Sequence, residues 1–323
     1  MGEMKYKCPL SVETIKIAKD ELREDEVTRE QALEILRSWI ERNPRIENCR
    51  MDASFLLRFL RFKKFSVPMA QEALERYLLL RQCYEYSFRN LDIQQPNMTE
   101  LFDKGYLFAA HGRDKKGRRV IIARPGVFDP HKFRNIDMCR IHGIIYETLM
   151  EDEESQVRGF VHFNDGVGVS FPHLTLFTPK ECVRIVKNGE RTMPMRHKEV
   201  HVINVPPSLK YVLDFGMSLI SEKIRSRVKI YSSVEEAHEH IDKNMLPKEY
   251  GGEMPMAEMI DLFRKELEAS RGLLLSHDEE LKVREDMFSE SAKCGAVSAL
   301  KNGGNCNPHQ DILACSFRKL EVD

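Results

Sequence analysis

The sequence predicts an α/β fold with a mainly parallel sheet, preceded by a small all-α domain. Two patterns carry this prediction: apolar residues recur at helical spacing through residues 28–90, and after residue 96 short β-branched runs alternate with helical segments. Strands that alternate with helices form parallel sheets with helical crossovers. The chain has 323 residues, 42% of them hydrophobic, which suffices for about two domains with a sizeable core.

The amino-terminal part is predicted to be helical. Residues 1–27 are polar and charged, and we expect a loose arm with one short helix near Val12–Leu22. Thr28-Arg-Glu-Gln31 has the form of a capping box, which predicts that a helix begins at Thr28. That helix should end at Asn43-Pro44. Further helices are expected over Asp52–Phe62, with Asp52 as the N-cap, and over Val67–Tyr84.

The second part alternates strands and helices. Strands are expected at Arg119–Arg124, Gly159–Asp165, Glu199–Val205 and Val228–Tyr231. Helices are expected at Ile136–Glu151, Pro179–Asn188, Ser208–Ser226, Ser233–Asn244 and Met256–Leu273. The predicted organisation is an arm (1–27), a helical domain (28–95), an α/β domain (96–255), a helical extension (256–289) and a tail (290–323). The tail is polar and aperiodic, so we expect it to be disordered.

Composition excludes several classes of protein. The 50 basic and 51 acidic side chains give a net charge of -1, so a nucleic-acid partner is not expected. No apolar run approaches the roughly 18 residues that span a bilayer. The polar start lacks the apolar core of a signal peptide, and the eight cysteines form no CxxC pair. We therefore expect a cytoplasmic protein with reduced thiols.

The usual catalytic and metal-binding motifs are missing from the sequence. Gly166-Val-Gly168 is followed by Phe171 where a dinucleotide fingerprint needs glycine. His238–Asp242 resembles the zinc motif HExxH, but Asp242 replaces the second ligand, and a solvated helix surface explains it better. Among Cys294, Cys306, His309 and Cys315, only Cys306 and His309 have the spacing of a compact ligand pair. We predict no catalytic residue, no metal, no cofactor and no enzymatic activity.

A series of motifs resembles one family. The segment 55–65, Phe-Leu-Leu-Arg-Phe-Leu-Arg-Phe-Lys-Lys-Phe, resembles the amino-terminal signature of CRAL-TRIO lipid-binding proteins. Arg118–Arg124, Gly159–Asp165, Val202–Pro206 and Leu246–Gly252 follow in that family's order and spacing. The resemblance covers about residues 28–272 and is greatest to alpha-tocopherol transfer protein, cellular retinaldehyde-binding protein and the clavesins. It implies a sheet that floors an apolar lipid cavity, closed by a mobile gate helix.

The resemblance also implies a ligand pocket. By similarity to the tocopherol carrier, the helix positions that face the ligand are His142 and Tyr146, one turn apart. The remaining pocket residues come from strands and one further helix: Phe160, His162, Asn164, Ile185, Val200 and Val202. The polar members favour a cargo with a polar end. The alternative is that His142 and His162 are ordinary hydrogen-bonded core or surface histidines.

The gate helix implied by the family lies within Ser208–Ser226. Its apolar surface consists of Val212, Phe215, Met217, Leu219 and Ile220. An ordinary core helix has the same composition, whereas a hinged helix could bury these residues when closed and meet a bilayer when open.

Basic residues are predicted beside the gate helix. Arg196, Lys198, Lys223 and Arg227 match the four positions that bind phosphoinositide head groups in the tocopherol carrier. Each basic group near an anionic membrane contributes about 1 kcal/mol. The alternative is a solvated charged face. A second basic run, Arg58, Arg61, Lys63 and Lys64, is interpreted as structural, with its charges paired between the two domains.

Together these patterns predict intracellular binding and transfer of a small hydrophobic ligand: a retinoid, a tocopherol-like molecule or another lipid. We expect a monomer that docks reversibly on phosphoinositide-containing membranes, with endosomal membranes as one candidate. The alternative is a phosphoinositide-sensing scaffold that moves no cargo. An enzyme of lipid metabolism has the least support, because no nucleophile or cofactor motif is found.

Overall fold

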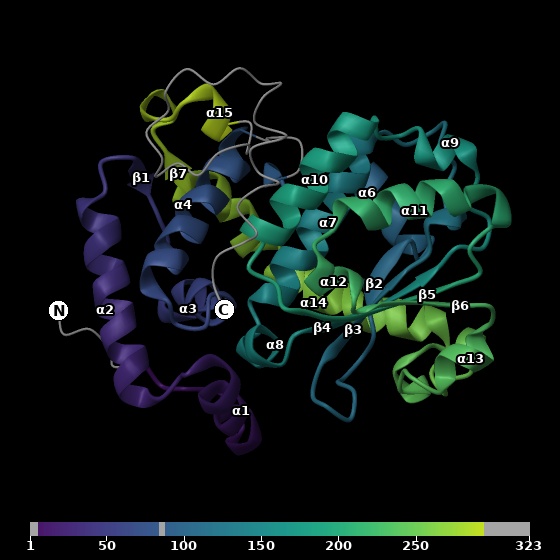
Figure 1. Cartoon of the computed structure of the whole chain (residues 1–323), viewed down its shortest axis with the longest axis horizontal. Helices are drawn as coiled ribbons and strands as arrows, with labels where there is room; N and C mark the ends of the chain where they lie inside the picture. The colour runs from purple at the N-terminus through teal and green to yellow at the C-terminus, as the bar shows by residue number, and fades with distance from the viewer. Residues whose placement is uncertain (1–5, 84–87, 294–323) are drawn as a thin grey trace.

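The computed structural model describes residues 6–83 and 88–293. A group of amino-terminal helices lies beside a sheet with helices on both faces, and a long carboxy-terminal helix packs along both parts (Figure 1). This arrangement confirms the predicted α/β fold with a helical domain before it. No helix within the described ranges is long and apolar enough to cross a membrane.

The amino-terminal helices are α1 (Val12–Leu22), α2 (Glu26–Arg42), α3 (Ala53–Phe62) and α4 (Val67–Cys83). Asp52 caps α3 as predicted, accepting a hydrogen bond from the Phe55 amide at 3.0 Å. The predicted start of α2 at Thr28 is wrong. The Asp25 carboxylate accepts from the Thr28 amide at 2.8 Å, so the helix begins two residues earlier.

The predicted helix at Val12–Leu22 is confirmed as α1, whereas the expectation that it belongs to a loose arm is wrong. Its residues Thr14, Ala18 and Leu22 are buried. Helix α8 (Glu153–Arg158) holds it, because the Arg158 Nε donates to the Thr14 hydroxyl at 2.7 Å. A helix with a buried apolar face and polar attachments is part of the folded body.

The sheet has five strands in the order β2-β3-β4-β5-β6. They are β2 (Leu107–Ala109), β3 (Arg119–Ala123), β4 (Phe160–Asp165), β5 (His197–Ile203) and β6 (Val228–Tyr231). Only β2, which was not predicted, runs antiparallel to its neighbour. In β5, His197 lies opposite Phe160 and Glu199 lies opposite Val161, so Lys198 is an extra residue in a bulge.

Helices cover both faces of the sheet. The helices that follow the amino-terminal group are α6 (Pro96–Asp103), α7 (Asn135–Met150), α8, α9 (Phe171–Leu174), α10 (Pro179–Thr192), α11 (Lys210–Leu219), α12 (Glu222–Arg225), α13 (Val234–His238), α14 (Met256–Glu280) and α15 (Glu290–Lys293), of which α15 packs against α4 instead of the sheet. Single turns of 3-10 helix occur at η1 (Pro125–Val127), η2 (Pro207–Leu209), η3 (Lys243–Met245), η4 (Lys248–Tyr250) and η5 (Glu285–Met287).

The two faces of the sheet have different partners. On one face, Tyr146 of α7 meets His162 of β4, with 6.3 Å between ring centroids. On the other, Phe163 of β4 meets Tyr250 of η4 at 5.1 Å. Successive strand residues point to opposite faces, so this alternation sets which side chains can face α7.

Further helix predictions need correction. The segment Ser208–Ser226 is not one helix, because Ile220 is extended and the Ser221 side chain caps α12. The predicted helix over Ser233–Asn244 ends at His238, and Asp242 then caps the turn η3. Helix α14 continues seven residues beyond Leu273, to Glu280.

The carboxy-terminal extension returns to the helical domain. Its strand β7 (Lys282–Val283) pairs with β1 (Ile46–Asn48), a two-stranded sheet that was not predicted. The first tail residues form α15 rather than a disordered segment. The rest of the predicted disordered tail, 294–323, and with it the candidate pair Cys306 and His309, lies outside the described residues.

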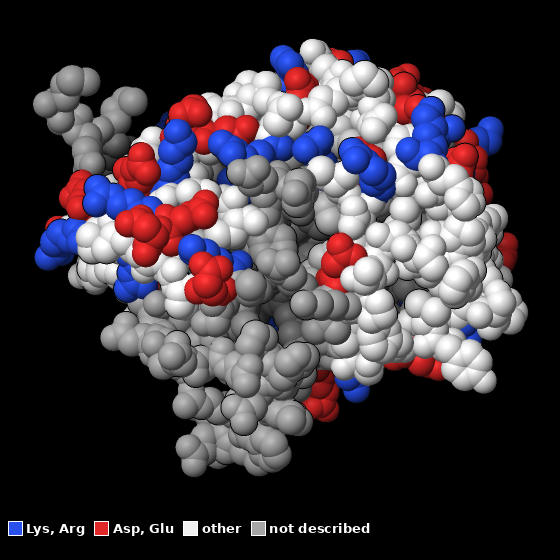
Figure 2. All heavy atoms as spheres, turned by 90° about the horizontal axis from the view of Figure 1, so that it is seen from above, with Lys and Arg blue, Asp and Glu red and all other residues white. Residues whose placement is uncertain are grey.

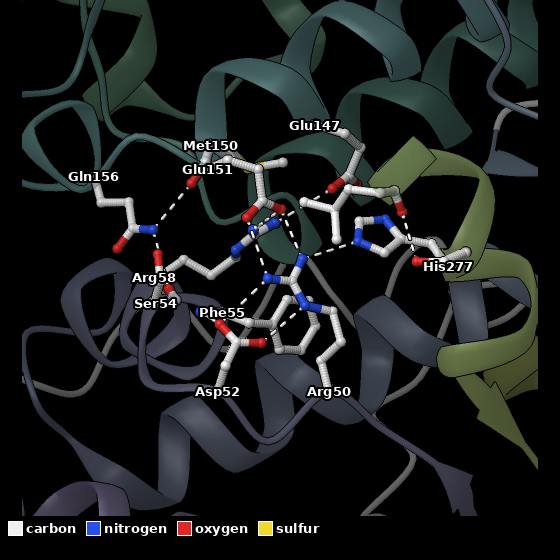
Figure 3. Close-up of polar contacts among 12 residues, drawn as sticks. Arg50, Asp52, Ser54, Phe55, Arg58, Glu147, Met150, Glu151, Gln156 and His277 are labelled. Carbon is white, nitrogen blue, oxygen red and sulfur yellow. Dashed lines mark hydrogen bonds and ion pairs between the residues drawn. The ribbon is translucent and has the colours of Figure 1, made fainter. Parts of the chain in front are cut away.

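A buried ion network joins the helical domain to the α/β domain (Figure 3). Arg58 of α3 bonds Glu147 of α7 at 3.3 Å and Glu151 at 2.6 Å. Arg61 bonds Glu24 and Glu153, each at 2.8 Å. The interpretation of these two arginines as structural is confirmed, whereas Lys64 is exposed.

Candidate functional site

A row of five rings runs from the residue before β2 across α7 and β4 to the start of β5. We name it the aromatic row; its members are Tyr106, His142, Tyr146, His162 and His197. Successive ring centroids are 5.7, 5.4, 6.3 and 5.0 Å apart. Helical spacing places His142 and Tyr146 on one face of α7, and strand alternation aims His162 at them. Two predicted pocket histidines and the predicted tyrosine are thus brought together.

The rings of the aromatic row are partly accessible, yet they have lost much of their solvation. His142, Tyr146, His162 and His197 are only half-buried by accessible area. Yet burial lowers the pKa of His142 and raises the pKa of Tyr146 to about 12. These side chains are thus accessible in part, yet their charged forms have lost solvation.

The three histidines of the row are uncharged at neutral pH. Burial, with repulsion from His197 and other histidines, holds the pKa of His162 well below its usual range. Burial and then the Arg227 guanidinium lower the pKa of His197 to about 4. The rings of His162 and His197 share one hydrogen bond of 2.8 Å between Nε2 and Nδ1. A site with neutral donors and acceptors selects against a charged ligand.

Hydrogen-bonding atoms in the row remain available. His142 Nδ1 lies 2.8 Å from the Met138 carbonyl oxygen, so Nδ1 carries the proton and Nε2 is a free acceptor. Within the described ranges, nothing hydrogen-bonds to the Tyr146 hydroxyl or to His142 Nε2. One acceptor and one hydroxyl on neighbouring rings, 5.4 Å apart between centroids, are therefore without a hydrogen-bond partner among the described residues.

The other predicted pocket residues take different places. In the register of β4 and β5, Val200 lies beside His162 and Val202 beside Asn164, and all four are half-buried. Phe160 shares this face but is only 1% exposed, so it packs in the core rather than forming open wall. Ile185 of α10 is 43% exposed. The strand residues are thus brought together with the row.

Helix α11 contains the predicted gate residues except Ile220, which follows its last residue, and none of the residues of α11 is buried. Val212 and Phe215 are exposed, and Met217, Leu219 and Ile220 are half-buried. A Cβ atom added at Gly216 would meet no atom within 4 Å. An apolar helix that buries no side chain is unusual, because burial of its apolar face is what normally stabilises it. Figure 2 shows a broad uncharged area on the side of the molecule where α9 and α11 lie.

The end of α11 is attached to α12. The Arg225 guanidinium donates to the carbonyl oxygens of Met217 and Ile220, at 3.0 and 3.4 Å. These bonds satisfy carbonyl groups that the end of a helix leaves free. Helix α12 thereby connects α11 to the basic residues on either side of Arg225.

The four predicted basic residues, Arg196, Lys198, Lys223 and Arg227, gather at the start of β5 and β6, and we name them the basic patch. Burial, followed by repulsion from Arg227, Lys64 and Arg196, lowers the pKa of Lys223. Burial is also the main cause that lowers the pKa of Lys198. Cations that depress one another's pKa in this way form one positive site. Lys64 was interpreted as structural, but the structure places it close to this patch.

Sequence reasoning missed three residues of these two sites: Tyr106, His197 and Glu21. The predicted strand began at Glu199, and simple alternation cannot place His197 on the face of Val200. The bulge at Lys198 does so. Glu21 of α1 bonds both Arg196 and Lys198, at 2.6 and 2.8 Å. No local signal marks such a contact between segments far apart in the sequence.

The structure also bears on the motifs that were set aside. Within residues 6–83 and 88–293, no group of three or more acidic, histidine or cysteine side chains could hold a metal ion. His238, the first residue of the segment that resembles a zinc motif, instead places its Nε2 2.7 Å from the Tyr250 carbonyl oxygen. That contact holds η4 against α13.

Comparison with known families gives two adjacent matches. Residues 103–252 match the CRAL/TRIO domain family, and residues 25–98 match the Pinta-like UBA domain family. The second match covers the helical domain from α2 to the start of α6. The first covers the sheet, the aromatic row and the basic patch.

Similar proteins match both segments together. The alpha-tocopherol transfer protein-like proteins of Mus musculus and Homo sapiens are 30% identical over 251 residues, which is 76% of this chain and 72% of each relative. Clavesin-1 of Xenopus laevis is 28% identical over 251 residues, or 77% of this chain and 76% of the relative. The crystal structure of Sfh5 has a TM-score of 0.53 and 15% identity over 73% of this chain and 92% of Sfh5, which supports the fold alone.

Proposed function

Because this chain belongs to the CRAL/TRIO domain family, we propose that it encloses one small hydrophobic molecule and transfers it between membranes. The aromatic row carries this proposal: its rings are partly accessible, yet their pKa values are those of groups removed from water. Alpha-tocopherol transfer protein-like proteins are among its relatives, and their name indicates transfer of a hydrophobic molecule. A lipid leaves a membrane only if its apolar surface, worth about 25 cal/mol per Å², is covered again.

The cargo is proposed to have one neutral polar end. The free His142 Nε2 can accept a hydrogen bond, and the Tyr146 hydroxyl can donate one or accept one. Because burial lowers the pKa values of His142 and His162, neither ring offers a positive charge to a carboxylate at neutral pH. A long apolar molecule with a hydroxyl or carbonyl group fits this chemistry better than a fatty acid does.

Helix α11 is proposed to be the gate. Its apolar side chains include Val212 and Phe215, 38% and 42% exposed, and no side chain of α11 is buried. Moving such a helix sacrifices little core packing. Its exposed side chains would then meet the bilayer while the interior space is open.

The basic patch is proposed to dock the protein on phosphoinositide-containing membranes. Its four cations stand at one end of the sheet, and α12 connects two of them to the gate. At about 1 kcal/mol for each basic group, four give reversible binding. In the competing function, a membrane-bound scaffold, the patch would act without cargo.

Ligand transfer tests the proposal. Donor vesicles loaded with a fluorescent hydrophobic alcohol, and separately with its hydrocarbon analogue, are mixed with acceptor vesicles and the protein. We expect faster transfer of the alcohol, and we expect the double variant His142→Phe/His162→Phe to lose that preference. Unchanged preference in the variant would refute the polar-end assignment, and no transfer of either ligand would favour the scaffold.

Membrane docking is tested separately by flotation with phosphatidylcholine vesicles, with and without a phosphoinositide. The wild type should float only with the phosphoinositide, and the double variant Lys223→Ala/Arg227→Ala should remain in solution. Equal flotation in all four combinations would remove the basic patch from the mechanism.

A further inference from the structure

One carboxylate already occupies half of the basic patch. Glu21 of α1 accepts from Arg196 Nη2 at 2.6 Å and from Lys198 Nζ at 2.8 Å. The other two cations of the patch have no such partner, because within the described ranges no acidic side chain pairs with Lys223 or Arg227. The Arg227 guanidinium instead donates to the His197 carbonyl oxygen. The patch is therefore divided into a neutralised half and an open half.

The position of Glu21 is fixed by the helix that carries it. Helix α1 is packed through Ala18 and Leu22, which are 1% and 0% exposed. At its other end, the Ser11 amide donates to a carboxylate oxygen of Glu154 in α8. Because Glu21 directly precedes the buried Leu22, its backbone is held near β5 whenever α1 is docked, and its carboxylate stays within reach of the basic patch.

A carboxylate and a phosphate compete for the same donors. Both are anionic acceptors for guanidinium and ammonium groups, in short charge-assisted bonds. Burial works against ionisation of Glu21, but its bonds to Lys198 and Arg196 outweigh burial and hold its pKa below the usual range. It is therefore negative at neutral pH and reduces the formal charge of the four-cation patch from +4 to +3.

We propose that Glu21 is an internal competitor for the phosphate group of a membrane phosphoinositide. This inference rests on the proposed docking function of the patch. In solution Glu21 holds Arg196 and Lys198, and a head group that enters from Lys223 and Arg227 displaces it. The Glu21 side chain is 44% exposed, so rotation about its own bonds releases both cations while α1 stays in place.

The consequence is a threshold for docking. A single anionic lipid engages Lys223 and Arg227 without displacing Glu21, whereas a head group with several phosphates can contact all four cations. Helix α12 carries Lys223 together with Arg225, which holds the end of α11. Displacement of the Glu21 carboxylate thus precedes full binding of the head group by all four cations, including those next to the gate.

The test is the variant Glu21→Gln with Asp20→Asn as its matched control. Both remove one negative charge from α1, but Asp20 is exposed and makes no ion pair with any described residue. Binding is measured to phosphatidylcholine vesicles containing a phosphoinositide, to vesicles of equal charge made with phosphatidylserine, and to a soluble inositol phosphate. We expect Glu21→Gln to bind phosphoinositide vesicles about fivefold more tightly than the wild type, and Asp20→Asn to bind as the wild type does.

A second comparison separates competition from a general charge effect. In the background Arg196→Ala/Lys198→Ala, the change Glu21→Gln should bring no gain. A gain of the same size in that background would overturn the proposal. So would equal binding by Glu21→Gln and Asp20→Asn, provided that binding of the wild type depends on Lys223 and Arg227. If neither the wild type nor Glu21→Gln binds phosphoinositide, the docking function fails together with the inference. Gain with the soluble inositol phosphate alone would refute the membrane assignment.

Discussion

Replacement of Glu147 by glutamine should loosen the junction between the two domains. The Glu147 carboxylate is fully buried in α7 and accepts from the Tyr77 hydroxyl at 2.6 Å and from Arg58 and Arg81, each at 3.3 Å. Glutamine keeps the volume and one acceptor oxygen but removes the charge. The two arginines are 0% and 3% exposed, so water cannot replace the lost partner.

The expected loss in free energy of unfolding depends on which ion pairs the buried arginines keep in the variant. Removing one partner of a buried ion pair costs about 3–5 kcal/mol, because the other charge stays buried and unpaired. Arg58 keeps its 2.6 Å bond to Glu151, which places the expected loss near the lower limit, about 3 kcal/mol. For a chain of this size, that corresponds to a fall of about 6–12 °C in the unfolding midpoint.

Denaturant titration of Glu147→Gln measures this loss, with Glu279→Gln as the matched control. Glu279 makes the same kind of bond, to Lys282, but its side chain is 78% exposed. We expect the control to unfold as the wild type does, because exposed ion pairs contribute little. A Glu147→Gln protein as stable as the control would refute the view that this network holds the domains together.

Two further predictions concern pH and close packing. Burial and Arg227 lower the pKa of His197 to about 4, so between about pH 6.5 and 4 the unfolded chain takes up a proton at this residue while the folded chain does not. Acidification from pH 7 to 5 should therefore lower the free energy of unfolding by about 2 kcal/mol through this residue. Denaturant titrations at the two pH values should show a smaller loss in His197→Gln. An equal loss in both proteins would contradict this. Gly252→Ala would place a Cβ 1.7 Å from the Leu246 carbonyl oxygen and should lower the unfolding midpoint strongly. In Gly216→Ala the added Cβ meets open space, so the free energy of unfolding should stay within about 1 kcal/mol of the wild-type value. Equal midpoints in the two variants would contradict the packing assigned to each glycine.

The regular parts of the fold could be predicted from local patterns. Asp52 correctly predicted the start of α3, and short runs rich in β-branched and aromatic residues predicted β3, β4 and β6. The short strands β1 and β7 could not be predicted, because their two or three residues carry no periodicity and depend on a partner more than 200 residues away. Ile220 and Ser221 interrupt an apolar run whose composition favours a continuous helix.

The site was predictable only in part, for a related reason. His142 and Tyr146 share a helix face by spacing alone, so their proximity follows from the sequence. His197 enters the row only through a bulge, and one extra residue changes which face a side chain occupies. Glu21 and Arg196 come from distant segments, and only the docking of α1 brings them together.

Native mass spectrometry of the full chain, after incubation with a mixture of neutral lipids and hydrophobic alcohols, tests most directly whether the space beside the aromatic row holds a ligand. We expect one bound molecule per chain, and we expect Val200→Trp, which places a large side chain beside His162, to lose the adduct while keeping the wild-type unfolding midpoint. An adduct that persists unchanged in Val200→Trp, or a wild-type protein that binds none of these molecules, would contradict the account.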